Sequence, residues 1–411
     1  MAANSQREFF AVRTLEEALT GFRPSRRTGT ERIELEDALG RVPAEAVVAP
    51  EALPGFARAT VDGFAVRAAD TYGASEGLPS YLELAGEARM GLPPSVEVRP
   101  GTAAAIATGA PLPPGADAVL MVEHTQSAAP ELVEVLRPVA PGDGMVRADE
   151  DAAPGAELAP IGRPLRAQDL GMLASAGVTG VSVFARPRVT VVSTGDELVP
   201  AATPELDIGQ VRDSTAVALA ALVREAGGEP RHAGIVPDDR DALAATLRGA
   251  LGESDVLVVS AGSSVGARDE TAAAIASLGE PGIWCHGLAF RPGKPTLLAE
   301  CGGVPVIGLP GNPRSALVVF RLLGVPIVRL VGGCTETPPE PTARAQLGRD
   351  LPSAAGRVDV VQARVRDGVA TPLFGSSSLL SILTGADGYL VVPEAATGLP
   401  AGSDVEVTLY R

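Results

Sequence analysis

The chain has 411 residues and a formal net charge of −16, with 45% hydrophobic and 20% charged residues. This length and apolar content predict two to four domains with substantial cores and argue against wholesale disorder. The acidic balance excludes a general nucleic-acid-binding protein, which needs basic stripes, although a local group of cations can still hold a small anion.

The first half of the chain combines helical and β-like segments. A helix is expected over 14–20, followed by a second segment with apolar spacing through residue 40. Another helix is expected over 167–175, before the glycines at 177 and 180. Short β-like runs that alternate with Gly/Pro turns predict a small β domain inserted between these helical pieces. These runs lie at 81–85, 96–98, 104–107, 118–122 and 132–136.

From residue 188 the pattern becomes β-α-β-α, which predicts a doubly wound α/β domain. The expected strands lie at 189–192, 232–236, 256–260 and 304–307, and the expected helices at 214–226, 241–251, 270–278 and 314–323. The apolar run 317–330 contains Arg321 and Arg329, so it predicts a buried helix and not a membrane span. The last 77 residues read as short strands and turns.

The expected fold is therefore a multidomain α/β plus β chain. The domains are expected to be a split N-terminal domain, an inserted β domain, a doubly wound α/β domain and a C-terminal β domain. Their expected bounds are 1–49 with 152–184, 50–151, 185–333 and 334–411.

The cysteines and the N-terminus indicate the compartment. Cys285, Cys301 and Cys334 have no C-x-x-C spacing and their number is odd, which favours free thiols in a reducing cytoplasm over disulfides or a zinc site. The N-terminal residues include Arg7, Glu8 and Arg13, so no apolar signal region is expected there.

One position stands out by its side chain. Of the 34 basic residues, Lys294 is the single lysine, and all the others are arginines. Lysine is a compact point charge and arginine a planar fork, so a lysine kept against such a bias suggests a site where arginine cannot serve. Pro292, Gly293 and Pro295 stiffen the backbone around it. The alternative is a lysine that has survived by chance on a surface loop.

Four Gly-, Pro- and Ser-rich turns are expected at the carboxyl ends of strands, where open α/β sheets bind their ligands. Backbone N–H groups in such turns bind phosphate well, and two of the residues are cations, so we expect a site for an anionic ligand. There is no G-x-G-x-x-G and no Walker lysine motif, which disfavours an ordinary dinucleotide site or P-loop. The expected binding residues are Ser193, Thr194, Gly195, Gly262, Ser264, Gly266, Arg291, Gly293, Pro310, Gly311, Asn312 and Pro313.

Acidic residues follow several of these turns, and carboxylates beside a phosphate site usually indicate Mg²⁺. Glu197, Asp269 and Asp239 are the expected metal ligands, with Asp62, Asp151 and Asp238 as further acidic candidates. Taken singly, each such acidic residue is more often a helix cap or a solvated side chain, and Asp213, just before the helix expected over 214–226, is an example of such a cap.

The run 262–266 also matches the G-x-S-x-G pattern of a hydrolase nucleophile, with Ser264 as nucleophile and Asp269 and His286 in triad order. All three lie within 23 residues, with no room for the usual intervening sheet. A serine hydrolase is therefore a disfavoured alternative.

Taken together, six stretches make the chain resemble the molybdopterin molybdenumtransferase family, which includes MoeA and the E domain of gephyrin. They are ATVDGFAV (59–66), ATGAPLPPGADAV (107–119), STGDEL (193–198), SVGARDE (264–270), RPGKP (291–295) and LPGNP (309–313), in the family's order. The resemblance implies a Mg²⁺-dependent transferase that inserts molybdenum from molybdate into adenylylated molybdopterin and releases AMP. It also implies a molybdopterin-binding α/β domain, a C-terminal β-barrel, and a homodimer that shares its site between subunits.

The resemblance carries roles over to matching positions. Asp62 and Thr108 would face the ligand from the inserted domain, while Glu197, Asp238 or Asp239, and Asp269 would line the α/β site. Lys294, Pro310 and Pro313 belong to the two family loops, and Asp151 matches a further acidic position.

Three residues depart from the family pattern: Arg291 replaces the first lysine of a Lys-Pro-Gly-Lys-Pro loop, Ala59 replaces a serine, and Ala261 replaces a glycine. These departures leave open a specialised or slow paralogue. A non-catalytic molybdopterin-binding or scaffold paralogue is a further alternative, because the E domain of gephyrin also clusters a receptor.

Overall fold

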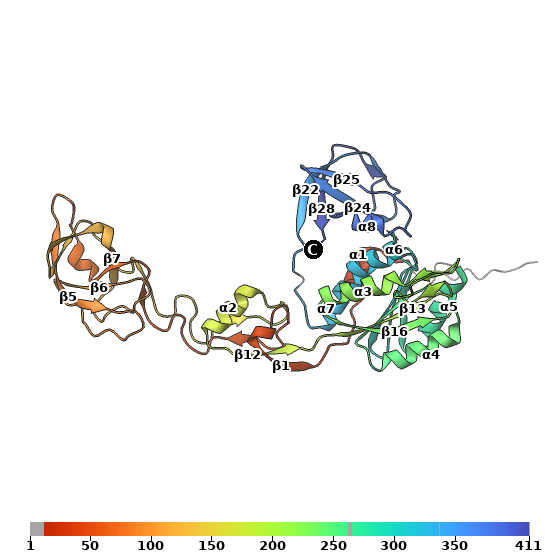
Figure 1. Cartoon of the computed structure of the whole chain (residues 1–411), viewed down its shortest axis with the longest axis horizontal. Coiled ribbons are helices and arrows are strands. Elements are labelled where there is room, and N and C mark those ends of the chain that lie inside the picture. Colours follow the sequence, from red (N-terminus) through yellow and green to blue (C-terminus); the bar gives the residue numbers. More distant parts are fainter. Residues whose placement is uncertain (1–11, 262–264, 337, 411) are drawn as a thin grey trace, which may run out of the picture.

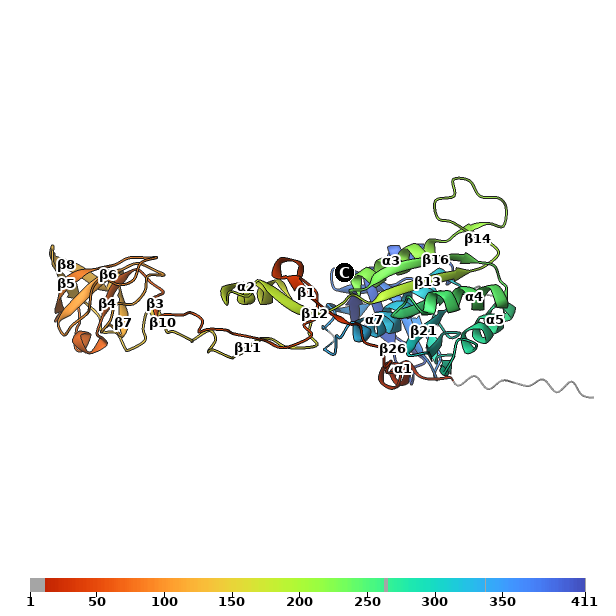
Figure 2. The ribbon, with the colours of Figure 1, turned by 90° about the horizontal axis from the view of Figure 1, so that it is seen from below.

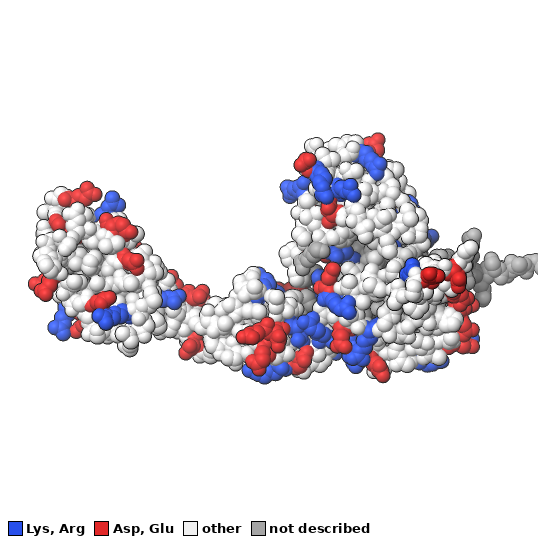
Figure 3. All heavy atoms as spheres, viewed as in Figure 1, with Lys and Arg blue, Asp and Glu red and all other residues white. Residues whose placement is uncertain are grey.

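The computed structural model describes residues 12–261, 265–336 and 338–410, and for 265–269 it describes the backbone alone. The molecule is drawn out lengthwise: a β unit lies at one end, an α/β unit with an adjoining barrel lies at the other, and a thin connecting segment joins them (Figure 1; Figure 2). On the face shown in Figure 3, acidic and basic side chains both occur on every part of the chain. None of the helices in the described parts has the length and apolar character that crossing a bilayer needs.

The N-terminal helix α1 begins where the sequence predicts. The Thr14 hydroxyl accepts a hydrogen bond from the Glu17 N–H at 3.0 Å, and the Glu17 carboxylate accepts one from the Thr14 N–H at 2.9 Å, a reciprocal helix cap. The next expected segment, which runs through residue 40, is not a continuous helix. It contains strand β1, which pairs with β12 about 150 residues further along the chain. Helix α1 spans Leu15–Gly21. The elements of the connecting segment are β1 (Thr30–Glu34), η1 (Leu35–Asp37), β2 (Val47–Val48), β11 (Glu157–Ala159), α2 (Ala167–Ser175) and β12 (Gly180–Phe184).

The distal β unit is a six-stranded sheet in the order β7-β4-β6-β5-β9-β8. Four of the five expected β runs are strands, whereas 96–98 is not. That run follows Pro93 and Pro94, which have no N–H to donate to a ladder, and Val98 makes its bond to the carbonyl of Pro114 instead. The elements are β3 (Arg58–Ala59), β4 (Gly63–Val66), η2 (Ala68–Thr71), β5 (Ser80–Ala88), β6 (Thr102–Ile106), β7 (Ala118–Met121), η3 (Val122–His124), β8 (Thr125–Ala129), β9 (Leu132–Val135) and β10 (Met145–Val146).

The α/β unit has a six-stranded sheet in the order β16-β13-β17-β21-β20-β18, with the first four strands parallel. Its central strands are buried on both faces, as continuous apolar runs predict: α3, α6 and α7 pack on one face, and α4 and α5 on the other. The elements are β13 (Arg188–Thr194), β14 (Leu198–Val199), β15 (Val211–Arg212), α3 (Ser214–Glu225), β16 (Glu229–Val236), α4 (Arg240–Leu251), β17 (Val256–Ser260), α5 (Val265–Ala276), β18 (Pro281–His286), β20 (Leu297–Cys301), β21 (Val304–Leu309), α6 (Pro313–Val319), η4 (Phe320–Gly324) and α7 (Val325–Val331).

Two features of this unit escaped the sequence analysis. Strands β18 and β20 extend the sheet in antiparallel fashion, and no β-α-β rhythm marks them. The helix that was expected to stop at residue 323 continues to Val331 through the wider π turn η4. Pro326 cannot donate a backbone hydrogen bond, and a local π turn absorbs the missing bond without ending the helix.

The C-terminal unit is a barrel closed by five strands, because β24 pairs with β25 on one side and with β26 on the other. The elements are β22 (Thr342–Leu347), β23 (Leu351–Pro352), β24 (Val358–Arg366), β25 (Val369–Pro372), α8 (Ser381–Thr384), β26 (Gly388–Val392), β27 (Gly398–Leu399) and β28 (Asp404–Leu409).

The barrel is attached to the α/β unit by a strand. β19 (Phe290–Arg291), from the loop between β18 and β20, pairs in parallel with β24, so that Phe290 lies beside Val358 and Arg291 beside Asp359. Arg321 reinforces this junction from η4, with contacts of 3.5 Å to Glu225 and 3.4 Å to Glu340 and its guanidinium over the Tyr410 ring. The two units therefore form a fixed cleft between them.

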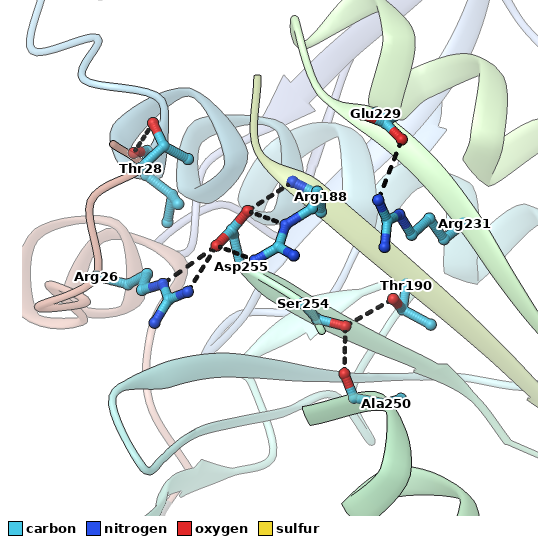
Figure 4. A network of polar contacts seen from close by, with 10 residues as sticks. Arg26, Thr28, Arg188, Thr190, Glu229, Arg231, Ala250, Ser254 and Asp255 are labelled. Carbon is cyan, nitrogen blue, oxygen red and sulfur yellow. Dashed lines mark hydrogen bonds and ion pairs between the residues drawn. The ribbon is translucent and has the colours of Figure 1, made fainter. Parts of the chain in front are cut away.

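A buried carboxylate stabilises the α/β sheet at the end where its parallel strands begin. Asp255, just before β17, accepts hydrogen bonds from the backbone N–H and side chain of Arg188 at the start of β13 and from the side chain of Arg26 (Figure 4). Burial alone would raise the pKa of Asp255, but the hydrogen bonds from Arg188 and Arg26 outweigh it and hold this pKa below its usual range. The carboxylate thus ties the N-terminal segment to two adjacent central strands.

Replacing Asp255 by Asn should destabilise the α/β unit by about 2 kcal/mol at neutral pH, since it leaves two arginines without their partner. A lowered pKa gives stability that is present above the unfolded pKa of about 4 and lost as pH falls through the folded pKa, so the difference from wild type should shrink in acid. Urea unfolding followed by the fluorescence of Trp284, the chain's one tryptophan, measures this. The exposed control Asp404→Asn should change stability by under about 0.5 kcal/mol. An Asp255→Asn variant as stable as wild type at pH 7 would refute the role of this carboxylate.

Candidate active site

The carboxyl ends of the parallel strands meet at one edge of the α/β sheet. Ser193 of β13 pairs with Ser260 of β17, and Ser260 pairs with Leu309 of β21. Three of the turns expected to bind a ligand therefore start side by side. β18 runs in the same direction as β21, so the Lys294 loop that follows it leaves from this edge as well.

A pocket of about 180 Å³, the strand-end pocket, opens among these turns. It brings together Thr194, Glu197, Gly311, Asn312 and Pro313 of the expected site. Ser193 and Gly195 are buried beside it, and the hydroxyl of Ser193 has no hydrogen-bond partner among the described residues. Residues that the sequence analysis did not place in the site also line the pocket: Arg212, Asp213, Ser214, Thr215 and Ser260.

Asp213 has two roles, of which the sequence indicated one. It is the expected cap of α3, since one carboxylate oxygen accepts the Ala216 N–H at 3.0 Å. Its other oxygen, Oδ2, is buried and has no hydrogen-bond partner in the described part of the chain. A buried unpaired carboxylate oxygen is costly, so it marks a place where a cation or a donor group of a ligand would be stabilised.

Two other acidic candidates, Asp238 and Asp239, lie along this edge. Asp238 accepts the Thr194 hydroxyl at 2.9 Å, and Asp239 caps α4 by accepting the Ala242 N–H at 2.8 Å. Neither lines the strand-end pocket with Glu197. Within the described residues no three acidic, His or Cys side chains are grouped as metal ligands. Gly262, Ser264 and the side chain of Asp269 lie outside the described residues, while Gly266 belongs to α5.

The Lys294 loop is held in one shape. Gly293 has φ of 133°, and a Cβ there would lie 2.3 Å from Val319 and 2.9 Å from Phe290. Its carbonyl accepts both the N–H and the hydroxyl of Thr296, and the Lys294 carbonyl accepts the Leu288 N–H at 2.9 Å. The backbone therefore presents the Lys294 and Arg291 side chains from a rigid frame.

These side chains face a cavity of about 680 Å³ between the loop and the barrel, here called the cationic cleft. Arg291, Lys294, Arg314 and Arg357 line it, and no acidic residue is among its described lining. Ser376 and Ser377 add hydroxyl groups from the barrel. Arg357 pairs with Asp359 at 2.9 Å, whereas Arg291, Lys294 and Arg314 have no carboxylate partner among the described residues, so an anion bound here is stabilised.

The sequence indicated Arg291, Gly293 and Lys294 as residues of an anion site. It did not indicate Arg314, Arg357, Ser376 or Ser377. No local pattern marks the barrel residues, because they reach the loop only through the pairing of β19 with β24. The cleft and the strand-end pocket are neighbours: Asn312 and Pro313 line the pocket, and the next two residues, Arg314 and Ser315, line the cleft.

Asp62 and Thr108 meet each other far from these cavities. The Thr108 N–H and hydroxyl donate to one Asp62 oxygen at 2.7 and 2.8 Å, and these bonds lower the pKa of Asp62, so it stays ionised. Both residues are in the distal β unit, at the opposite end of the molecule from the α/β unit (Figure 1). Within one chain, the pair cannot complete the site around Lys294.

Comparison with known proteins gives a consistent family assignment. Residues 12–177 match the MoeA N-terminal region (domains I and II), 190–330 a probable molybdopterin-binding domain, and 344–410 the MoeA C-terminal region (domain IV). A molybdopterin molybdenumtransferase of Bacillus subtilis is 34% identical over 93% of this chain and 90% of its own length. A protein of the same name from Nostoc is 38% identical over 74% of this chain and 70% of its own length.

Solved structures agree with the sequence relatives. A crystal structure of the molybdopterin biosynthesis MoeA protein of Pyrococcus horikoshii OT3 has a TM-score of 0.83 and 31% identity, covering 97% of this chain and all of that one. A second MoeA structure from Pyrococcus horikoshii has a TM-score of 0.78 and 36% identity, with 97% and 99% covered. The elongated arrangement of the units is thus shared.

Replacing Gly293 by Ala should distort the Lys294 loop and destabilise the protein by about 3 kcal/mol, because the new Cβ overlaps Val319 and takes a disfavoured φ. Thermal unfolding and sulfate binding by calorimetry should both show the loss. Gly249→Ala is the matched control, since its Cβ meets nothing within 4 Å in helix α4 and alanine favours a helix. Unchanged sulfate affinity in Gly293→Ala would show that the loop frame does not set the cleft.

Proposed function

The chain belongs to the MoeA family of molybdopterin molybdenumtransferases, and from this premise we propose that it transfers molybdenum from molybdate to adenylylated molybdopterin and releases AMP. The observation that carries the proposal is the cationic cleft, in which Arg291, Lys294 and Arg314 have no carboxylate partner among the described residues. Molybdate and the pyrophosphate of the pterin substrate are both anions, and such a cleft attracts and holds them. We also propose that the four structural units are the four domains, with the bounds expected from the sequence.

The cations would act by positioning and by charge. Lys294 offers a small ammonium with three donors, and Arg291, Arg314 and Arg357 offer guanidinium groups that can bind oxyanions in pairs of hydrogen bonds. The Ser376 and Ser377 hydroxyls can orient oxygens of the same anion. Fixed donors aimed at charge that develops during transfer lower the barrier without reorganising at that moment.

The strand-end pocket would take the part of the substrate beyond the cleft, with Thr194 and the turn residues Gly311, Asn312 and Pro313 along it. Its Glu197 and the unpaired Asp213 oxygen fit Mg²⁺, which usually binds one or two carboxylates together with substrate phosphate oxygens. Of the metal ligands expected from the sequence, Glu197 lines this pocket and Asp269 would join it, whereas Asp239 caps α4. When bound, the ion would supply charge stabilisation to the phosphate that leaves as AMP.

We propose a homodimer in which Asp62 and Thr108 of one subunit complete the cleft of the other. The support is the length of the molecule, which separates this pair from Lys294 within one chain (Figure 1). A two-fold dimer lets each distal β unit reach the partner's α/β unit while its own site is completed in return. We further propose that the protein works in the cytoplasm, since all three cysteines are buried free thiols.

Purified protein supplied with adenylylated molybdopterin, molybdate and Mg²⁺ should release AMP, and Lys294→Ala should lower kcat by ~100- to 1000-fold by removing one fixed positive charge. Lys294→Arg should keep substrate affinity within several-fold but lose most of kcat, since the fork does not reproduce a compact ammonium. Chromatography of AMP measures both variants. No AMP from the wild-type protein that still binds the substrate would instead support a non-catalytic binding paralogue. Full activity in Lys294→Arg would make the lone lysine incidental.

Mixing two inactive variants tests the shared site. Asp62→Asn and Lys294→Ala should each be inactive alone, but co-expressed chains that pair at random should recover about a quarter of wild-type AMP release, because half the dimers are mixed and each has one intact site. Pairing Lys294→Ala with Lys294→Arg is the control, since no mixed dimer then has an intact site. Recovery no better than this control would place Asp62 and Lys294 in separate functions.

A further inference from the structure

A second, smaller cavity lies behind the cationic cleft. This inner chamber measures about 220 Å³ and shares Arg291, Pro292, Arg314 and Gly375 with the cleft. Its remaining walls come from the barrel, through strand β24, the edge strand β23 and residues 373–375. The chamber thus lies at the junction at which β19 joins the barrel sheet.

Two hydrogen-bond donors of the chamber lining are unpaired. Gln362 is 2% exposed; its amide oxygen accepts the Tyr410 hydroxyl, and its amide nitrogen has no partner among the described residues. The Nε of Arg314 is also buried, and the described residues offer it no acceptor. Buried donors left unpaired are costly and rare, so two that line one cavity indicate an acceptor that binds there.

The charge of the chamber is positive. Burial lowers the pKa of Arg314, and repulsion from the positive charge of Arg291, which lines the same chamber, lowers it further. The single acidic residue of the described lining, Asp359, is already engaged by Arg357 at 2.9 Å and by the Ser353 hydroxyl at 3.0 Å. A ligand for this chamber must therefore bring acceptors and negative charge together, which excludes metal cations and neutral donors.

We propose that the inner chamber binds a free tetrahedral oxyanion, distinct from the anion in the cationic cleft, through Arg314, Gln362 and Arg291. Its occupant neutralises the repulsion between Arg291 and Arg314 and so positions Arg291 at the lip of the cleft. A chamber of about 220 Å³ has room for an oxyanion of the sulfate or molybdate class and not for a nucleotide with its pterin partner. The inference rests on the proposed function only in taking the cleft to be the place where substrate anions bind.

Equilibrium dialysis of the full chain with labelled sulfate, an unreactive tetrahedral dianion, counts the sites. Wild type should bind two sulfates per chain. Gln362→Leu, which changes the chamber alone, should lose one sulfate and keep the other. Arg314→Leu should lose one and weaken the other, because Arg314 also lines the cleft, and Lys294→Ala should weaken the sulfate that Gln362→Leu keeps. Arg344→Leu, an exposed arginine of the barrel strand β22, is the matched control and should retain both.

Gln362→Glu separates loss of the site from loss of folding. The new carboxylate would take the place of the bound anion beside the guanidinium groups, so this variant should bind one sulfate fewer and melt several degrees higher than wild type in anion-free buffer. A misfolded variant would melt lower.

Wild-type binding of a single sulfate, or two sulfates retained in Arg314→Leu, would overturn the proposal. So would AMP that displaces the sulfate lost in Gln362→Leu, since the chamber would then be a nucleotide subsite. If the wild-type protein binds both sulfates but releases no AMP, the proposed activity is refuted, while the proposal for the inner chamber is still supported.

Discussion

The pairing of β19 with β24 is the contact on which the functional geometry depends. It inserts two residues of an α/β loop into the sheet of the barrel, so that Arg291 lies beside Asp359. Every cation of the cleft is placed by this contact, because Arg291, Lys294 and Arg314 come from the α/β side and Arg357 from the barrel. Without it the barrel would be a separate module, and the positive charges would be spread over two surfaces.

The α/β sheet supplies the second constraint. Its parallel strands end level with one another, so the polar turns that follow them form one edge, while Asp255 fixes the opposite edge through Arg188 and Arg26. The strand-end pocket and the cationic cleft are consecutive along the first residues of α6.

How much of this the sequence could predict depends on how local each signal is. Helix α2 and strand β17 coincide with their expected ranges, since their apolar patterns and flanking residues lie next to them in the chain. Lys294 was found because composition and two prolines mark it. Arg357 and Gln362 were not, because nothing near them says that β24 will receive a strand from a loop over 60 residues earlier. Asp213 was read as a helix cap alone, since one residue can cap a helix with one oxygen and offer the other to a ligand.

The central claim is that substrate anions bind in the cleft between the Lys294 loop and the barrel. Crystals soaked with molybdate and AMP, measured at the molybdenum absorption edge, locate the metal directly by its anomalous signal. We expect a peak in the cationic cleft, within contact of Lys294, Arg357 and the Ser376 hydroxyl. Molybdenum peaks that occur only away from this cleft, in crystals whose cleft is open to solvent, would contradict it.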